Sequence, residues 1–424
     1  MICYNGDMEQ TFYLTLVERK IALIQLVFNA SLAEDRFLTE IAQPVHTQFP
    51  SIRLEYRRED PRLSDYMSNW KSAGEYPDIQ LWSAYSTNTL IQNKLCANLE
   101  EVSRPMEAEL DRTRFEPGLL AWGLGDAEEL FALPYCDVMT YPMFYNKDIF
   151  DAAGVPYPWD GMIWTDMIQL AHRLAECESS SANVSLDVGD WPLLRMQQGV
   201  TFLHPQTGEP SVINDAWRSV ARILREVYSV PGNLLQDSKK LLRFSGVFVR
   251  ERRAAMAVIC ASCFEPEVLN FRWDAVTYPT PTSSNVPAGP NIPGNLMLSI
   301  SSSCREQTAA HAVVAYLLSD EFQAVNTRNG TLTSLRAMEV RSQFGLEVPM
   351  YADKNRPAFY LHRPAAPPPR SLDRVVQMEQ GIVAYNLARN AMTEMILRSQ
   401  DPDWALEKLN RALTEALKVY SLKG

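Results

Sequence analysis

The sequence predicts a protein built from two α/β lobes, and three observations lead to this fold class. At 424 residues the chain is too long for one ordinary hydrophobic core, so two cores are the natural expectation. Hydrophobic residues make up 46% of the chain and charged residues 21%, which is typical of a folded globular protein. In the first third, short apolar segments alternate with amphipathic helical ones, as they do in mainly parallel sheets.

The first strand is predicted at residues 21–28, a continuous apolar run typical of a strand buried on both faces. Residues 34–49 place apolar side chains on one helical face, and Pro44 predicts a kink or a break within this helix. Two further strands are predicted at residues 52–56 and 77–82. This β-α-β-α-β order predicts a mostly parallel sheet with right-handed crossovers.

Two strand ends of this sheet supply candidate ligand-binding residues, because ligands bind parallel sheets at the carboxyl ends of the strands. Asn29 and Ser31 follow the first strand, while Trp82 and Tyr85 lie at the end of the third. Aromatic rings cover the apolar C–H faces of sugar rings, and polar groups bind the hydroxyls. Packing of Trp82 and Tyr85 in the core of the lobe is the alternative interpretation.

The segment 131–159 is rich in Tyr and Pro and ends in a turn-rich connector. Further along, Trp191 is a candidate aromatic platform for a ligand in the second lobe. Residues 278–294 predict a crossover loop, and Asn291 and Asn295 are candidate ligand contacts there, with a surface turn as the alternative. The other predicted elements are helices at 165–175, 214–228 and 307–319, strands at 254–260 and 296–301, and two closing helices, the second beginning at Asp401 and Pro402.

Charge and motifs argue against several classes of function. The net charge of −11 argues against a nucleic-acid partner, because phosphate binding needs clustered Lys and Arg, and also against an anionic membrane surface. No apolar run reaches the ~18 residues that a membrane span needs. The five histidines are scattered, and no HExxH, Gly-x-Ser-x-Gly or P-loop pattern occurs. We therefore expect neither catalytic residues nor a cofactor.

Cys260 and Cys263 have the spacing of a metal-binding or redox pair. No second pair and no nearby histidine accompanies them, so we expect two structural thiols and no metal site. The chain holds seven cysteines at scattered positions, an odd number that does not predict a disulfide framework. Such cysteines favour a reducing compartment.

The start of the chain leaves the compartment open. Residues 21–33 resemble the end of a signal peptide, but the charged residues 18–20 precede them directly and the apolar run is only about eight residues long. A first buried strand explains this run better. Export with a signal removed and a cytoplasmic location therefore both stay open, as does the role of residues 1–19.

Several motifs follow one another along the chain. The most specific is Leu130-Phe-Ala-Leu-Pro-Tyr135, followed by Phe144-Tyr-Asn-Lys-Asp-Ile-Phe-Asp-Ala-Ala-Gly-Val-Pro-Tyr-Pro158 and Trp164-Thr-Asp-Met. Weaker ones are residues 46–54, Tyr76-Pro-Asp-Ile-Gln-Leu-Trp82, Ala254-Ala-Met256 and a helix pair at 309–330. Together they span nearly the whole chain from Lys20. In this order they resemble the extracellular solute-binding proteins of family 1, the sugar-binding proteins of ABC importers.

The resemblance implies the type II fold of periplasmic binding proteins. In that fold two lobes, each a mainly parallel sheet flanked by helices, are joined by hinge strands around a cleft. The cleft closes on a ligand because the closed form gains contacts with both lobes. The N-terminal lobe would comprise residues 20–133 and 280–345, and the C-terminal lobe residues 134–279 and 346–424, after an extension of residues 1–19.

For function, the resemblance implies a monomeric bacterial protein that captures a small solute, a saccharide such as an oligosaccharide, for ABC permease subunits. It implies no enzyme activity. Trp82 matches an aromatic ligand-contact position of the family, and Tyr135 and Asp137 lie where the chain first crosses between lobes. The carboxylate of Asp137 suits paired sugar hydroxyls as a charged acceptor.

Two departures from the family's pattern bear on the ligand. After the strand Ala254-Ala-Met256 the family often has a Trp, and here Ser262 replaces it, so a stacking contact is lost unless Phe264 supplies it. The family also often has a Pro after the Asn329-Gly330 motif, whereas this chain continues Thr-Leu-Thr-Ser-Leu335. The ligand should therefore differ from maltodextrin.

Two other functions stay open. The cysteines and the lack of a clear export signal fit a cytoplasmic ligand-sensing domain of the same fold, linked to a transcription regulator. A carbohydrate-active enzyme is the third candidate, although Glu128 and Glu129, the adjacent acidic pair, are poorly placed as an acid and a base.

Overall fold

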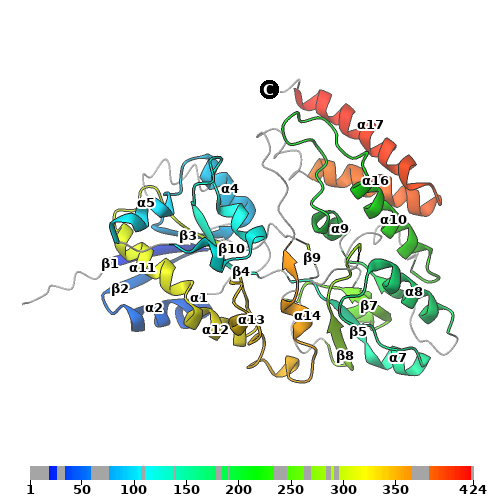
Figure 1. The fold of residues 1–424 in the computed structure, drawn as a ribbon, viewed down its shortest axis with the longest axis horizontal. Helices are drawn as coiled ribbons and strands as arrows, with labels where there is room; N and C mark the ends of the chain where they lie inside the picture. The colour runs from blue at the N-terminus through cyan, green and yellow to red at the C-terminus, as the bar shows by residue number, and fades with distance from the viewer. Residues whose placement is uncertain are drawn as a thin grey trace, which may run out of the picture. The chain divides into compact units, whose positions relative to one another are not determined.

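The chain folds into two compact units in a computed structural model, whose elements are labelled in Figure 1. Unit 1 comprises Met1–Leu110, Gly125–Ala132 and Met297–Ser319, and unit 2 comprises Asp111–Leu124, Leu133–Leu296 and Asp320–Gly424. The structure describes residues 19–25, 34–58, 76–106, 110–137, 140–177, 184–189, 191–233, 246–261, 269–282, 288–290, 296–364 and 382–421.

This division differs from the lobe boundaries expected from the sequence. Unit 2 contains residues 111–124, 133, 280–296 and 320–345, which the sequence predicts in the N-terminal lobe. A backbone hydrogen bond and a buried ion pair connect residues 111–124 with residues 320–345. The backbone of Arg336 donates to that of Arg114 at 2.7 Å, and the buried Arg341 side chain lies 3.9 Å from the buried carboxylate of Glu116.

Unit 1 is built on four strands that lie in the order β10-β3-β1-β2. They are β1 (Arg19–Gln25), β2 (Ile52–Arg58), β3 (Ile79–Ser83) and β10 (Leu296–Ile300). β1 pairs in parallel with both β2 and β3, which confirms the parallel arrangement predicted for the first three strands. β3 and β10 are buried along their whole length, as expected for apolar strands with both faces covered.

The helix predicted after the first strand is interrupted near Pro44, as the sequence predicts. It consists of α1 (Glu34–Phe37), a π-helical turn (Leu38–Ala42) and α2 (Gln43–Gln48). The ring of Pro44 clashes with the preceding turn and its nitrogen cannot donate, so the wider π-helical turn directly before α2 relieves the conflict. Phe37, Ile41 and Val45 of the predicted apolar face are buried.

Three more helices belong to unit 1: α4 (Ala84–Gln92), α5 (Leu99–Ser103) and α11 (Gln307–Leu317). Side chains cap two of them. The Ser83 hydroxyl accepts from the backbone N of Ser86, and the Asn98 amide oxygen accepts from the backbone N of Glu100. Helix α11 confirms the helix predicted at 307–319.

Unit 2 contains a four-stranded sheet in the order β6-β7-β5-β8. Its strands are β5 (Met143–Asn146), β6 (Val184–Asp187), β7 (Ala254–Val258) and β8 (Trp273–Val276). β6 and β7 are parallel, whereas β5 is antiparallel to both β7 and β8. Three strands therefore run in one direction, and β5 begins at the edge where the others end. The sheet is mixed where the resemblance implies a mainly parallel one.

Two further strand pairs lie outside this four-stranded sheet. β4 (Ala132–Asp137), which begins at the end of unit 1, pairs antiparallel with β11 (Leu332–Thr333). β9 (Ala288–Gly289) and β12 (Arg363–Pro364) pair in parallel.

The described helices of unit 2 are α6 (Pro117–Leu120), α7 (Lys147–Ala153), α8 (Trp164–Ala175), α9 (Pro192–Gln197), α10 (Asp215–Ser229), α12 (Asp320–Arg328), α13 (Met338–Arg341), α14 (Pro357–Tyr360), α16 (Ile382–Leu397) and α17 (Pro402–Ser421).

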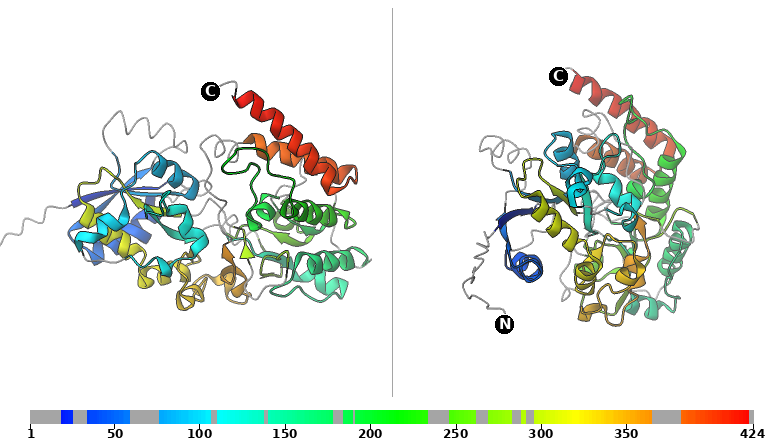
Figure 2. Two further views of the ribbon diagram at one scale, coloured as in Figure 1. Left: turned by 45° about the horizontal axis from the view of Figure 1, so that its top comes forward. Right: turned by 60° about the vertical axis from the view of Figure 1, so that its left-hand side comes forward.

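The two closing helices pack against α10 in the largest core of unit 2, and the three lie together in both views of Figure 2. The predicted start of α17 is confirmed, because the Asp401 carboxylate accepts from the backbone N of Asp403 at 2.8 Å and Pro402 is the first helical residue. Leu409 and Leu413 of α17 are fully buried in this core. None of the helices in the described ranges is both long and apolar enough to span a membrane.

This packing predicts that Leu409→Ala destabilises the protein, because the lost methyl groups leave a cavity in the core. We expect the free energy of unfolding to fall by about 2–5 kcal/mol. The matched control is Leu397→Ala at the end of α16, where half of the side chain is exposed, and a change within about 0.5 kcal/mol is expected. Urea unfolding of both variants measures the difference. Equal effects would show that α17 does not form part of the core.

Candidate functional site

One candidate surface is the edge of unit 1 at which β1, β2 and β3 end. The three carboxyl ends share this edge because the strands are parallel. At the end of β3, the Ser83 hydroxyl accepts from the backbone N of Ser86 at 3.3 Å and donates to the Ser86 hydroxyl at 3.1 Å. Tyr85 lies in the same first turn of α4, and its side chain is outside the described part of the structure. The edge therefore offers hydroxyl groups and the N–H groups of a helix start.

The structure places Trp82 within strand β3 and not in the loop after it. Its side chain is fully buried and packs with Leu90, Cys96 and the partly buried Phe131. Side chains alternate between the faces of a strand, so Trp82 points to the face opposite that of its neighbour Ser83. Trp82 therefore packs in the core of unit 1, which is the alternative interpretation from the sequence. No face of its ring is open for stacking on a sugar.

The second candidate surface is the edge of unit 2 where β6, β7 and β8 end. At the end of β6, the buried Asp187 carboxylate accepts from the backbone N of Gly189 at 2.9 Å. Gly189 has φ +64°, and a Cβ built there would lie 2.5 Å from the carbonyl oxygen of Val258, the last residue of β7. The chain after β6 is therefore pressed against the end of β7, in a conformation that favours glycine.

Trp191 lies shortly after Gly189 in the chain and is fully buried. Its ring stacks on Tyr385 at a centroid distance of 5.7 Å and contacts Trp217 and Phe202 at 6.3 and 6.4 Å. These contacts correct the expectation of a stacking platform, because the ring faces are covered by the core. The Trp191 Nε1 atom and the Tyr278 Oη atom each lie just past a strand end of this sheet. Both are buried, and neither has a hydrogen-bond partner among the described residues. Burial raises the pKa of the Tyr278 hydroxyl.

Tyr135 and Asp137 lie on β4, where the sequence places the first crossing between lobes. The Tyr135 side chain is buried, and its Oη accepts from Nδ2 of Asn326 on α12 at 3.2 Å. Asp137 pairs with Leu332 of β11 through the backbone, and its side chain is outside the described part. The neighbouring Ser334 hydroxyl donates to the Pro134 carbonyl. Hydrogen bonds to β11 and α12 therefore hold this strand in place.

The remaining sequence-predicted candidates lie outside the described residues: Asn29, Ser31, Phe264, Asn291 and Asn295. The structure thus describes the side chains of only Trp82, Tyr135 and Trp191 among the ten candidates. It adds Ser83, Ser86 and Asp187, which the sequence reasoning missed. One sequence pattern could have found two of them, because Ser83 and Asp187 are polar residues that end short buried strands.

A pocket of about 480 Å³ lies elsewhere on unit 1, lined by Cys96, Ala97, Asn98, Glu101, Val102, Glu129, Phe131, Ser302 and Gln307. Ser301, beside it, donates through its backbone N to the carbonyl of Asp78, the residue before β3 begins. The pocket is therefore near the starting end of β3 and apart from the edge that holds Ser83. It is not part of the candidate surface.

The described residues show neither a metal-binding cluster nor a disulfide. Among the described residues, no group of three or more His, Cys, Asp or Glu side chains could hold a metal ion. No disulfide joins any two of the five cysteines that the structure describes, Cys96, Cys136, Cys177, Cys260 and Cys304. Burial raises the pKa of the Cys96 thiol to about 12, so this thiol is protonated at neutral pH. Cys263 lies outside the described residues.

Comparison with known proteins identifies the class. The sequence matches the family model of bacterial extracellular solute-binding proteins over residues 47–335, more than half of the chain, so the chain belongs to this family. This confirms the resemblance found in the sequence. No protein among the curated sequences matches it.

Solved structures show the fold. A sugar transporter of Rhizobium etli in an open conformation has a TM-score of 0.71 at 15% identity, over 93% of this chain and 99% of that one. The cyclic α-maltosyl-1,6-maltose binding protein of Arthrobacter globiformis has a TM-score of 0.70 at 13% identity, over 94% and 99%. UgpB of Mycobacterium tuberculosis, in complex with glycerophosphocholine, has a TM-score of 0.63 at 15% identity, over 95% and 99%. The predicted two-lobed fold of type II periplasmic binding proteins is thus confirmed.

The tight approach at Gly189 predicts a large cost for Gly189→Ala. A left-handed alanine costs roughly 1 kcal/mol, and the clash with the Val258 carbonyl should add about 1–3 kcal/mol. Gly154→Ala is the matched control, because Gly154 has φ +65° and nothing within 4 Å of a built Cβ. Comparison of the two variants by urea unfolding isolates the clash. If both lose the same stability, β7 does not restrain this loop.

Proposed function

We propose that the chain is the substrate-binding component of a bacterial ABC importer and that its ligand is a carbohydrate, with an oligosaccharide as the first candidate. The observation that carries the proposal is the family match over residues 47–335, because it makes solute capture the function of the chain. A saccharide is supported by the descriptions of two of the similar structures, a sugar transporter and a binding protein for a cyclic maltosyl-maltose. UgpB makes a phosphodiester such as glycerophosphocholine the ligand class to test against it.

We infer that polar strand ends supply the ligand contacts, and each unit by itself has its own candidates. In unit 1 these are Ser83 and Tyr85, at the end of β3 and the start of α4. In unit 2 they are Tyr135, Asp137 and Asp187, two of which carry carboxylates that suit paired sugar hydroxyls. The orientation of Asp187 is fixed by its bond to the Gly189 backbone. Asn29, Ser31, Phe264, Asn291 and Asn295 stay candidates on the grounds of sequence.

Trp82 and Trp191 enter the proposal differently from the sequence expectation. Both rings are enclosed by core side chains, so they support the strand ends and do not stack on the ligand. Within the described part of the chain, Trp191 Nε1 has no hydrogen-bond partner.

The family is described as extracellular, and we propose an extracytoplasmic location with permease subunits as partners and a monomeric state in solution. The cytoplasmic sensing domain, which the cysteine content favoured, finds no support in the family. Binding proteins make up this family, so we propose that the ligand leaves chemically unchanged.

Thermal unfolding with a ligand panel tests the proposal. An oligosaccharide at about 100 times its dissociation constant should raise the free energy of unfolding by about 2.7 kcal/mol. The panel should include linear, branched and cyclic oligosaccharides, with glycerophosphocholine and amino acids as other ligand classes. A shift with glycerophosphocholine and none with any sugar would contradict the saccharide assignment. Recovery of hydrolysed sugar after incubation would contradict simple capture.

The contact assigned to Asp137 can be tested by Asp137→Ala. Loss of a hydrogen bond to a charged acceptor should weaken ligand binding about 10- to 100-fold. Asp166→Ala removes the same charge from the first turn of α8 and serves as the control. Calorimetric titration with the best ligand of the panel gives both affinities. Equal affinity in the two variants would remove Asp137 from the site.

A further inference from the structure

Helix α10 carries a stripe of arginines on the side that faces away from its core. Trp217 and Leu224 point into the core of unit 2 and are fully buried. Arg218, Arg222 and Arg225 follow at spacings of four and three residues, which places them on a common side of the helix. Four acidic residues accompany this stripe: Asp215 and Glu226 on α10, and Asp401 and Asp403 at the start of α17.

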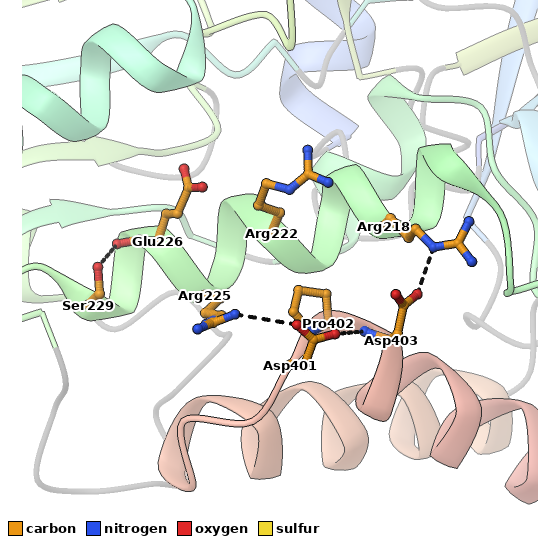
Figure 3. Close-up of a pocket in the computed structure, with 8 residues that line it drawn as sticks. All are labelled: Arg218, Arg222, Arg225, Glu226, Ser229, Asp401, Pro402 and Asp403. Carbon is orange, nitrogen blue, oxygen red and sulfur yellow. Dashed lines mark hydrogen bonds and ion pairs between the residues drawn. The ribbon is translucent and has the colours of Figure 1, made fainter.

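The start of α17 lies against this stripe and forms a pocket with it. The pocket has a volume of about 470 Å³, within the range of small-molecule sites. Figure 3 shows its eight lining residues, which come from α10 and from the beginning of α17: Arg218, Arg222, Arg225, Glu226, Ser229, Asp401, Pro402 and Asp403. All eight belong to unit 2, and none is a residue that we assign to the sugar.

Aspartates hold the two outer arginines. Arg218 binds Asp403 through Nε at 2.6 Å and Asp215 through Nη1 at 3.0 Å, and these bonds raise the pKa of its guanidinium. Arg225 lies 3.8 Å from the carboxylate of Asp401. Because Asp401 and Asp403 are fixed at the start of α17, both guanidinium groups are oriented before any ligand arrives.

Arg222, between them, forms no ion pair with the aspartates that hold its neighbours. Within the described residues no acidic oxygen lies within 4.0 Å of its guanidinium, and Figure 3 shows the group directed away from Asp401 and Asp403. Glu226 lines the same pocket without forming an ion pair with it. Arg222 is exposed and has a positive charge one helical turn away on each side. Aspartates offset the charges of Arg218 and Arg225, so Arg222 is the guanidinium on this side that can donate to a bound anion without breaking one of these ion pairs.

We propose that this pocket binds an oxyanion, a phosphate or carboxylate group carried by a small molecule, with Arg222 as its main contact. The planar guanidinium donates two parallel hydrogen bonds to such a group. The pocket exceeds the size of a single phosphate ion, so the rest of the small molecule would fill the space toward Ser229 and Pro402. An acidic side chain of a partner protein carries the same chemistry and is the other possible source.

The test uses the full chain as wild type, Arg222→Gln and Arg173→Gln. Arg173, an exposed residue in the last turn of α8, is the control for loss of one positive charge. Sodium phosphate, and separately a hexaglutamate peptide, is titrated at constant ionic strength by calorimetry. We expect the wild type and Arg173→Gln to bind with similar affinity. Arg222→Gln should bind about tenfold or more weakly. Phosphate binding supports a free small molecule, and peptide binding alone supports a protein carboxylate at the same site.

Two results would overturn the proposal. One is equal binding of the probes by all three proteins. The other is no binding of either probe to the wild type up to about 10 mM, a concentration at which the binding free energy would be less than ~3 kcal/mol. Arg222 is outside the proposed sugar contacts, so Arg222→Gln should keep the full thermal response to the sugar. Failure of the oxyanion site is therefore distinct from failure of the sugar assignment.

Discussion

The contact between Gly189 and the end of β7 is the constraint on which the candidate edge of unit 2 depends. A Cβ at position 189 would lie 2.5 Å from the Val258 carbonyl oxygen, so only glycine lets the chain turn there so close to the sheet. On one side of this turn the Asp187 carboxylate is held by the Gly189 backbone. On the other side Trp191 enters the core against Tyr385 and Trp217. A polar strand end thus rests on a rigid aromatic core.

The candidate strand ends are polar, whereas the tryptophans beside them are packed in the cores of the two units. Ser83 and Asp187 end buried strands in unit 1 and unit 2, and each is fixed by bonds to a neighbouring backbone N–H. Groups held in this way can match the hydroxyls of a sugar with little loss of freedom on binding. The arginine pocket on α10 has a different chemistry, because its oriented guanidinium groups suit an anion and not a neutral ring.

The sequence could predict features that depend on local patterns. Apolar runs located the strands of unit 1, Pro44 located the break before α2, and Asp401 located the start of α17. The ordered motifs also identified the family. Features set by long-range pairing could not be predicted, such as the antiparallel direction of β5 or the contact between Glu116 and Arg341, which are far apart in the chain. The same limit explains Trp82 and Trp191, since an aromatic residue at a strand end serves a core or a ligand depending on which face it occupies.

Hydrogen–deuterium exchange with and without a bound oligosaccharide tests the central claim most directly, because it reports each strand end separately. The account predicts slower exchange on binding at Ser83–Ser86 in unit 1 and also at Asp187–Gly189 and around Asp137 in unit 2, with little change in α16. Absence of protection at these strand ends while the sugar is bound would contradict this assignment of the ligand contacts.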